Sequence, residues 1–295
     1  MVRSGIEVAG TRRAPVLLRA VLVGIAVGAL GTLSWAKLAG ANIEHGSHVP
    51  WAVPVMAIVL AAWWQYFARG RGWPTSTGAV RRSLARANSL PEHLWGPALG
   101  AGVLGLLGVL LLQGVLGRLV ILPQQQEIDP SKFPLATVFA WVIMSAIVAG
   151  VVEETAFRGY IQGPIERRHG PVVAILVNSS LFGLAHLTHP EVGIILLPYY
   201  IAVAAVYGGL AYATNSTFPS MVLHAGGNML SAFSLFTQGR SEWQLGSSRP
   251  VLVWESGVDA AFVANVIALL VVSAGTFLAY RALISAGREV RLHAG

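Results

Sequence analysis

Two adjacent carboxylates, Glu153 and Glu154, lie within an apolar stretch of the chain, and Arg158 follows them. Ionisable side chains are costly inside an apolar span, so such groups usually serve a function. Glu154 and Arg158 are four residues apart and share a helix face, which predicts an ion pair between them. Glu153 lies about 100° further around the helix. Its carboxylate is therefore expected to point elsewhere, where it could act as a general base.

Two later apolar stretches also carry polar groups at helical spacing. Phe182 is followed four residues later by His186, and His224 is followed four residues later by Asn228. We expect Phe182 to pack rather than react. His224 and Asn228 share a helix face. Ser216, Thr217 and Pro219 have the residue types of a helix start. His224 is then within the first two turns, where the helix dipole favours developing negative charge.

These three groups together supply the parts of a hydrolytic site. They offer a base, a second base or ligand, a cation and a His/Asn donor pair, which are needed to activate a water and to stabilise a tetrahedral oxyanion. The predicted catalytic residues are Glu153, Glu154, Arg158, His186, His224 and Asn228. A further histidine, His189, precedes a proline and is expected to lie at the membrane interface without a catalytic role.

The composition indicates which elements must position these residues. Apolar residues make up 55% of the 295 residues, charged residues make up 11%, and the mean hydropathy is +0.64. Soluble domains have about 25% charged residues. The composition excludes a disordered chain, a fibre and an ordinary soluble enzyme. It predicts an all-α polytopic membrane protein with about eight transmembrane helices in one bundle. The predicted spans are 15–36, 50–68, 97–117, 134–163, 171–188, 192–213, 217–236 and 259–283.

Prolines and arginines refine this prediction. The fourth span is expected to begin at Pro134 and to end at Pro164, and the sixth is expected to kink at Pro198. The loop 69–96 is predicted to contain a short helix at the membrane surface. In that helix the basic residues Arg81, Arg82 and Arg86 are expected to face away from Val80, Leu84 and Ala87.

The charge distribution predicts the orientation. The net charge is +7, and 15 of the 20 basic residues fall on one side if the N-terminus is inside. Such a bias predicts that both termini are cytoplasmic, in an integral protein of a bacterial plasma membrane. It also favours contact with anionic lipid headgroups over binding of nucleic acid. The chain has no cysteine, which excludes a thiolate metal site and a cysteine nucleophile.

The chain is expected to divide into three regions. Residues 1–133 form an N-terminal membrane region with three spans and the arginine-rich loop. Residues 134–236 form a catalytic core of four helices, and residues 237–295 form an outside loop and the last span.

The residues of one catalytic site must lie at the same depth in the membrane. His186 lies roughly 22 Å from the cytoplasmic end of its predicted helix, and His224 only about 8 Å from the end of its own. A buried helix start near Pro219 would bring His224 to Glu153.

The ordered motifs EExxxR, FxxxH and HxxxN resemble those of the CAAX-protease and bacteriocin-processing (CPBP) family of intramembrane proteases, which includes the type II CAAX prenyl endopeptidases. The resemblance covers about residues 134–236. It implies a helical membrane fold with a cavity that opens towards the cytosol. It further implies that Glu153 and His186 activate the attacking water, and that His224 and Asn228 form the oxyanion hole. Glu154 and Arg158 would order the site.

The resemblance leaves the cofactor open, because the family has been described both as metalloproteases and as metal-independent glutamate proteases. Glu153, His186 and His224 could ligate zinc or another divalent metal. The sequence contains no HExxH motif. We favour a mechanism in which glutamate and histidine act directly on water, so no cofactor is firmly predicted, and zinc or another divalent metal is the alternative.

The leading interpretation is an intramembrane endopeptidase that cleaves membrane-associated proteins or peptides. Its partners would be the lipid bilayer and a peptide or protein substrate, with a lipidated substrate as one open alternative.

Two other functions could use the same residue types. A proton-coupled transporter would also place Glu, His and Arg inside the membrane, and it would show internal repeats or paired broken helices. A binding or immunity protein could keep the fold without turnover.

Overall fold

The computed structural model describes residues 13–45, 48–123, 132–188, 193–238 and 251–293. Over these ranges the chain is helical and contains no β-strand, which confirms the predicted all-α class. The α-helices are α1 (Arg13–Glu44), α2 (Ala52–Phe67), α3 (Gly78–Ala85), α4 (Glu92–Leu119), α5 (Leu135–Val148), α6 (Gln162–His169), α7 (Pro171–His186), α8 (Leu197–Thr214), α9 (Phe218–Gln238), α10 (Val253–Ser256) and α11 (Ala260–His293).

Several of these helices are long and apolar enough to cross a bilayer. There are five such stretches in the described ranges, namely Val16–Glu44, Glu92–Leu119, Leu135–His169, Ile194–Thr214 and Ala260–Gly287. The apolar helices α2 and α7 are shorter, with 16 residues each. A polytopic helical membrane protein is therefore confirmed, with a helix at each of the eight predicted spans. The count of eight crossings stays a prediction.

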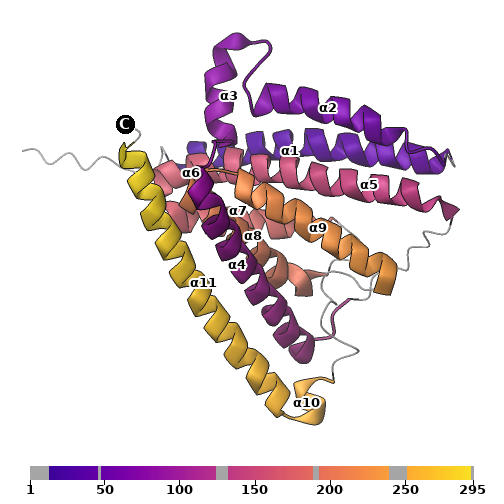
Figure 1. Cartoon of the computed structure of the whole chain (residues 1–295), viewed down its shortest axis with the longest axis vertical. Coiled ribbons are helices and arrows are strands. Elements are labelled where there is room, and N and C mark those ends of the chain that lie inside the picture. The colour runs from indigo at the N-terminus through magenta and orange to yellow at the C-terminus, as the bar shows by residue number, and fades with distance from the viewer. Residues whose placement is uncertain (1–12, 46–47, 124–131, 189–192, 239–250, 294–295) are drawn as a thin grey trace, which may run out of the picture.

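The helices fan out from one end of the molecule (Figure 1). Helices α1, α2 and α5 pack together along one side, and α4 packs along α11 on the other side. Helix α9 lies between α5 and α4, where it contacts both. Helices α7 and α8 form a tightly packed pair. The helices that carry the three motifs thus lie inside the fan, between the N-terminal helices and the C-terminal helix.

The predictions about two prolines were wrong. Pro164 does not end the fourth span, because helix continues through α6 to His169. Pro164 lies inside this continuous helical stretch, three residues after the π-helical segment Thr155–Ile161, whose hydrogen-bonding pattern differs from that of a regular α-helix. Pro198 does not kink the sixth span either, because α8 begins only at Leu197 and places this proline in its first turn. A proline there is preorganised for helix.

The expected orientation of the arginines around α3 was also wrong. Val80 is exposed, whereas Arg81 and Arg86 are buried. The Arg81 guanidinium donates to backbone carbonyls of the preceding loop, including that of Gly70. Arg86 donates through both terminal nitrogens to Glu166, at 2.9 and 2.8 Å. Guanidinium groups that find such partners are buried rather than solvated, since these contacts replace their hydration. Arg81 therefore connects α3 to the preceding loop, and Arg86 connects the end of α3 to α6.

The start of α9 lies inside the protein, near the predicted position. Thr217 and Ser216 are fully buried. The backbone N–H of Thr217 donates to the carbonyl of Arg86 at 3.0 Å, and the hydroxyl of Ser216 donates to the carbonyl of Asn88 at 2.6 Å. Ser216 also accepts from the N–H of Phe218 at 3.2 Å, as an N-terminal cap does. The segment after α3 thereby fixes the helix that carries His224.

Candidate active site

The two glutamates lie where the long helix changes its winding. The segments Ala149–Glu153 and Thr155–Ile161 on either side of Glu154 are π-helical. Wider turns of this kind are frequent at functional sites. Helix α9 approaches this segment closely, since a Cβ on Gly150 would lie 2.8 Å from the carbonyl oxygen of Met221. The chain thus presents both carboxylates at the contact with α9.

Glu154 is the buried member of the pair. Its carboxylate and the guanidinium of Arg158 have no exposed surface, and Oε1 of Glu154 lies 3.0 Å from Nη1 of Arg158. The same Oε1 accepts a hydrogen bond from Nδ1 of His224 at 2.8 Å. The predicted ion pair is therefore present. Glu154 also connects the π-helical segment to α9, which the sequence did not indicate.

Glu153 turns away from Glu154, as the spacing predicts. Its side chain is 22% exposed, and its Oε2 lies 4.0 Å from Nε2 of His224. His224 therefore has one carboxylate at each ring nitrogen. The separation of 4.0 Å is too long for a direct hydrogen bond, but a single water can bridge it. This contact confirms the expected convergence of His224 and Glu153.

His186 lies on α7 and is held by its own helix. Its Nδ1 lies 2.8 Å from the carbonyl oxygen of Phe182. A carbonyl only accepts, so Nδ1 carries the hydrogen, and Nε2 carries the lone pair in the neutral ring. Phe182 is buried and packs its ring 4.5 Å from the His186 ring, between centroids. Phe182 therefore packs, as expected.

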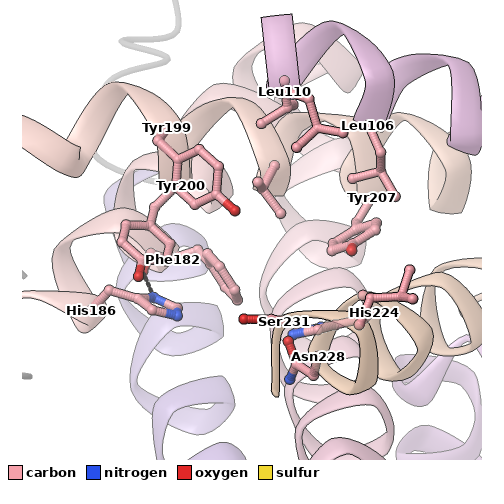
Figure 2. A pocket seen from close by; sticks show the side chains of 14 residues that line it. Leu106, Leu110, Phe182, His186, Tyr199, Tyr200, Tyr207, His224, Asn228 and Ser231 are labelled. Atoms are coloured by element: carbon pink, nitrogen blue, oxygen red, sulfur yellow. Dashed lines mark hydrogen bonds between the residues drawn. The ribbon is translucent and has the colours of Figure 1, made fainter. Parts of the chain in front are cut away.

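Two cavities meet at His186. The larger, about 490 Å³, lies between α1 and α7 and is lined by both Glu153 and His186. The smaller, about 180 Å³, is lined by His186, His224 and Asn228 together with mostly apolar side chains. Figure 2 shows the two histidines on opposite sides of the smaller cavity. All six predicted residues thus line a cavity or contact a residue that does: Glu154 contacts His224, and Arg158 lies over the ring of Phe182.

The sequence did not indicate the role of two tyrosines on α8. The Tyr207 ring stacks on His224 with 5.2 Å between centroids, and the Tyr200 ring stacks on His186 at 4.1 Å. Arg158 donates to the carbonyl of Ala204, between the two tyrosines, at 3.2 Å. The seven-residue spacing of the tyrosines is a possible signal, but it is common in buried helices. His189, which was expected to lack a role, lies outside the described residues.

The possible metal ligands do not gather into a metal site. In the part of the chain that the structure describes, no three His, Asp or Glu side chains lie together as a metal requires. Nδ1 of His224 is engaged by Glu154, and Nδ1 of His186 by a backbone carbonyl. A metal held by these residues would need Nε2 of His186, Nε2 of His224 and the Glu153 carboxylate to converge on one point. The described geometry does not bring these three groups together. We therefore derive no catalytic step through a metal.

Comparison with known proteins agrees with the motifs. Residues 135–230 match the family model described as type II CAAX prenyl endopeptidase Rce1-like. The matched segment runs from the start of α5 into α9 and contains all three motifs. It confirms the resemblance to the CPBP and CAAX protease family over about a third of the chain. No curated protein and no solved structure matches this chain.

Proposed function

We propose that this protein is an intramembrane endopeptidase that hydrolyses peptide bonds with a water activated by glutamate and histidine. The family match supports a CAAX-type intramembrane endopeptidase in general. The observation that carries the mechanism is the placement of His224 between two carboxylates. Glu154 lies 2.8 Å from its Nδ1, and Glu153 lies 4.0 Å from its Nε2.

Glu153 is the proposed general base. It lines the larger cavity together with His186, and we place the attacking water between these two side chains. The carboxylate takes one proton from this water as the oxygen attacks the scissile carbonyl carbon. Nε2 of His186 accepts a hydrogen bond from the same water and orients it. When the tetrahedral intermediate collapses, the proton on Glu153 passes to the leaving amine.

His224 and Asn228 are the proposed oxyanion donors. Both line the smaller cavity, on the far side of His186 from α1. The Asn228 amide donates through its nitrogen, and His224 donates through Nε2 when the ring is doubly protonated. Glu154 accepts the Nδ1–H and compensates the positive charge of that ring. Preorganised donors of this kind typically contribute about 3 to 4 kcal/mol of transition-state stabilisation each.

Glu154 and Arg158 are proposed to order the site without touching the substrate. Their ion pair is fully buried, and Arg158 also holds α8 through the carbonyl of Ala204. The Arg158 guanidinium lies over the Phe182 ring, with 4.6 Å to the centroid. A buried cation with these contacts has few alternative positions. The pair therefore fixes the π-helical segment, α8 and α9 relative to one another.

The substrate class follows from the surroundings of these residues. Both cavities are lined mainly by apolar side chains, and several of the helices around them, including α1, α4 and α8, are long and apolar enough to cross a bilayer. We propose a membrane-associated peptide or protein, presented in an extended form so that its carbonyl reaches the oxyanion donors. A lipid group on the substrate is compatible with the apolar lining.

The test is cleavage of a quenched fluorescent peptide library by the purified protein in liposomes. We expect cleavage by the wild-type protein that a chelator spares and that Glu153→Gln abolishes. Loss of cleavage with chelator and recovery with zinc would contradict the metal-independent mechanism. If membrane-tethered and free peptides both stay intact, the endopeptidase proposal is contradicted and a binding function is favoured.

A further inference from the structure

The two tyrosines on α8 form pairs with the two histidines of the site. Tyr200 and Tyr207 are seven residues apart, which is two helical turns, so they share one face of α8. Tyr200 stacks on His186 with an interplanar angle of 24°, and Tyr207 stacks on His224 with an angle of 18°. In Figure 2, Tyr200 lies beside His186 on one side of the smaller cavity, and Tyr207 lies on the same side as His224. Both tyrosines are buried.

A hydrogen bond alone does not fix the orientation of a histidine ring. Nδ1 of His186 is held by the carbonyl of Phe182, and Nδ1 of His224 by Glu154. The last side-chain torsion of histidine has a broad energy profile, so the ring can still tilt about such a bond. A flat ring packed against the imidazole face removes this freedom. The combination fixes the position of Nε2, the atom that would contact the water or the oxyanion.

Helix α8 is itself held in register with these histidines. Ala204 lies between the two tyrosines and is fully buried, and its carbonyl accepts from Nη2 of Arg158 at 3.2 Å. The Arg158 guanidinium also lies 5.4 Å from the centroid of the Tyr207 ring. Any sliding of α8 would break this hydrogen bond and move both phenol rings. The same arginine that pairs with Glu154 thereby sets where the tyrosines meet the histidines.

From this geometry we infer that Tyr200 and Tyr207 are positioning residues, which hold the imidazoles of His186 and His224 at the orientation needed for peptide hydrolysis. This inference rests on the proposed function for its catalytic consequence. The stacking is made by the aromatic faces, so a phenylalanine preserves the stacking and a leucine of smaller, non-planar shape does not. The effect is expected on kcat rather than on KM, because the positioned nitrogens act on the transition state.

The experiment compares Phe and Leu at each position, in the full-length protein in liposomes. Tyr200→Leu and Tyr207→Leu are each expected to lower kcat by about 10- to 100-fold, the range for catalytic groups displaced by about 1 Å. The Tyr→Phe variants keep the stacked rings and should lose clearly less kcat than the Leu variants. Tyr212→Leu is the matched control, since Tyr212 lies on α8 but lines neither cavity. Equal losses in the Phe and Leu variants would overturn the inference.

A second readout does not depend on activity. A stacked aromatic ring shifts the ring protons of histidine upfield in NMR spectra. The signals of His186 and His224 can be assigned from His186→Gln and His224→Gln variants. We expect Tyr207→Leu to move the His224 signals downfield and Tyr200→Leu to move those of His186, while Tyr212→Leu moves neither. Unchanged histidine shifts in the Leu variants would overturn the inference. If the shifts move but no variant cleaves peptides, the positioning stands and the proposed protease function fails.

Discussion

Glu154 and His224 are 70 positions apart in the sequence, yet Oε1 of the carboxylate accepts a hydrogen bond of 2.8 Å from Nδ1 of the imidazole. The same oxygen lies 3.0 Å from the Arg158 guanidinium. One buried carboxylate therefore joins the π-helical segment, α9 and, through Arg158, α8. The stability of the core and the geometry of the site depend on the same group.

Substitution of Glu154 by Gln should destabilise the protein. The change leaves the fully buried Arg158 without its ion-pair partner, and breaking a buried pair in this way costs about 3 to 5 kcal/mol. We expect the free energy of unfolding, measured in mixed micelles, to fall by about that amount. Adding Arg158→Met should restore part of the stability but no activity. A single variant as stable as the wild type would contradict the role assigned to this pair.

Gly150→Ala should reduce cleavage while leaving most of the helix content intact. The added methyl group would lie 2.8 Å from the Met221 carbonyl and would push α9, with His224, away from the glutamates. Displacement of about 1 Å can lower a rate about 100-fold. Gly100→Ala on α4 is the control, because a Cβ there meets nothing within 4 Å. Equal cleavage rates in the two variants, measured with one peptide, would show that this close approach does not matter.

The Arg86 and Glu166 side chains should be energetically coupled. Their two hydrogen bonds of 2.9 and 2.8 Å are largely buried, and the Arg86 backbone carbonyl holds the start of α9. A double-mutant cycle of Arg86→Ala and Glu166→Ala, followed by unfolding in micelles, is expected to give a coupling energy of about 1 to 3 kcal/mol. A coupling energy near zero would show that the contact between Arg86 and Glu166 does not stabilise the fold.

Helical spacing was sufficient to predict much of the site. Glu154 and Arg158 pair because residues four apart share a face, and the same rule places His224 and Asn228 on one cavity wall. The all-α class followed from composition. The helix start near Pro219 followed from residue types that cap helices, and it allows His224 to reach Glu153.

Other features depend on tertiary contacts that no local pattern specifies. The π-helical turns around Glu154 have no distinct residue signature in the sequence; Ala149–Glu153 packs against α9, and Thr155–Ile161 packs mainly against α1. Pro164 and Pro198 were wrongly expected to break helices. Pro198 lies in a first turn, which looks like an interior turn in sequence, and Pro164 follows a π-helical segment that no local pattern specifies. Arg81 and Arg86 were expected at the surface, but their partners are distant or are backbone carbonyls.

Removal of metal should leave cleavage unchanged. The described residues hold no group of three side chains fit to bind a metal, and the proposed mechanism activates the water with Glu153 and His186 directly. We expect equal kcat before and after dialysis against a chelator, with metal content followed by elemental analysis. Activity that tracks bound zinc in proportion would contradict the proposed mechanism.

The central claim is that Glu153 activates the attacking water, and its most direct test is the cleavage rate of Glu153→Gln in liposomes. Glu153 is partly exposed, so this variant should fold as the wild type does. Glu92→Gln, which removes an exposed carboxylate at the start of α4, is the control. Loss of a general base predicts a fall in kcat of about 100-fold or more for Glu153→Gln, with the control unchanged. A Glu153→Gln protein that cleaves peptides at the wild-type rate would contradict the claim.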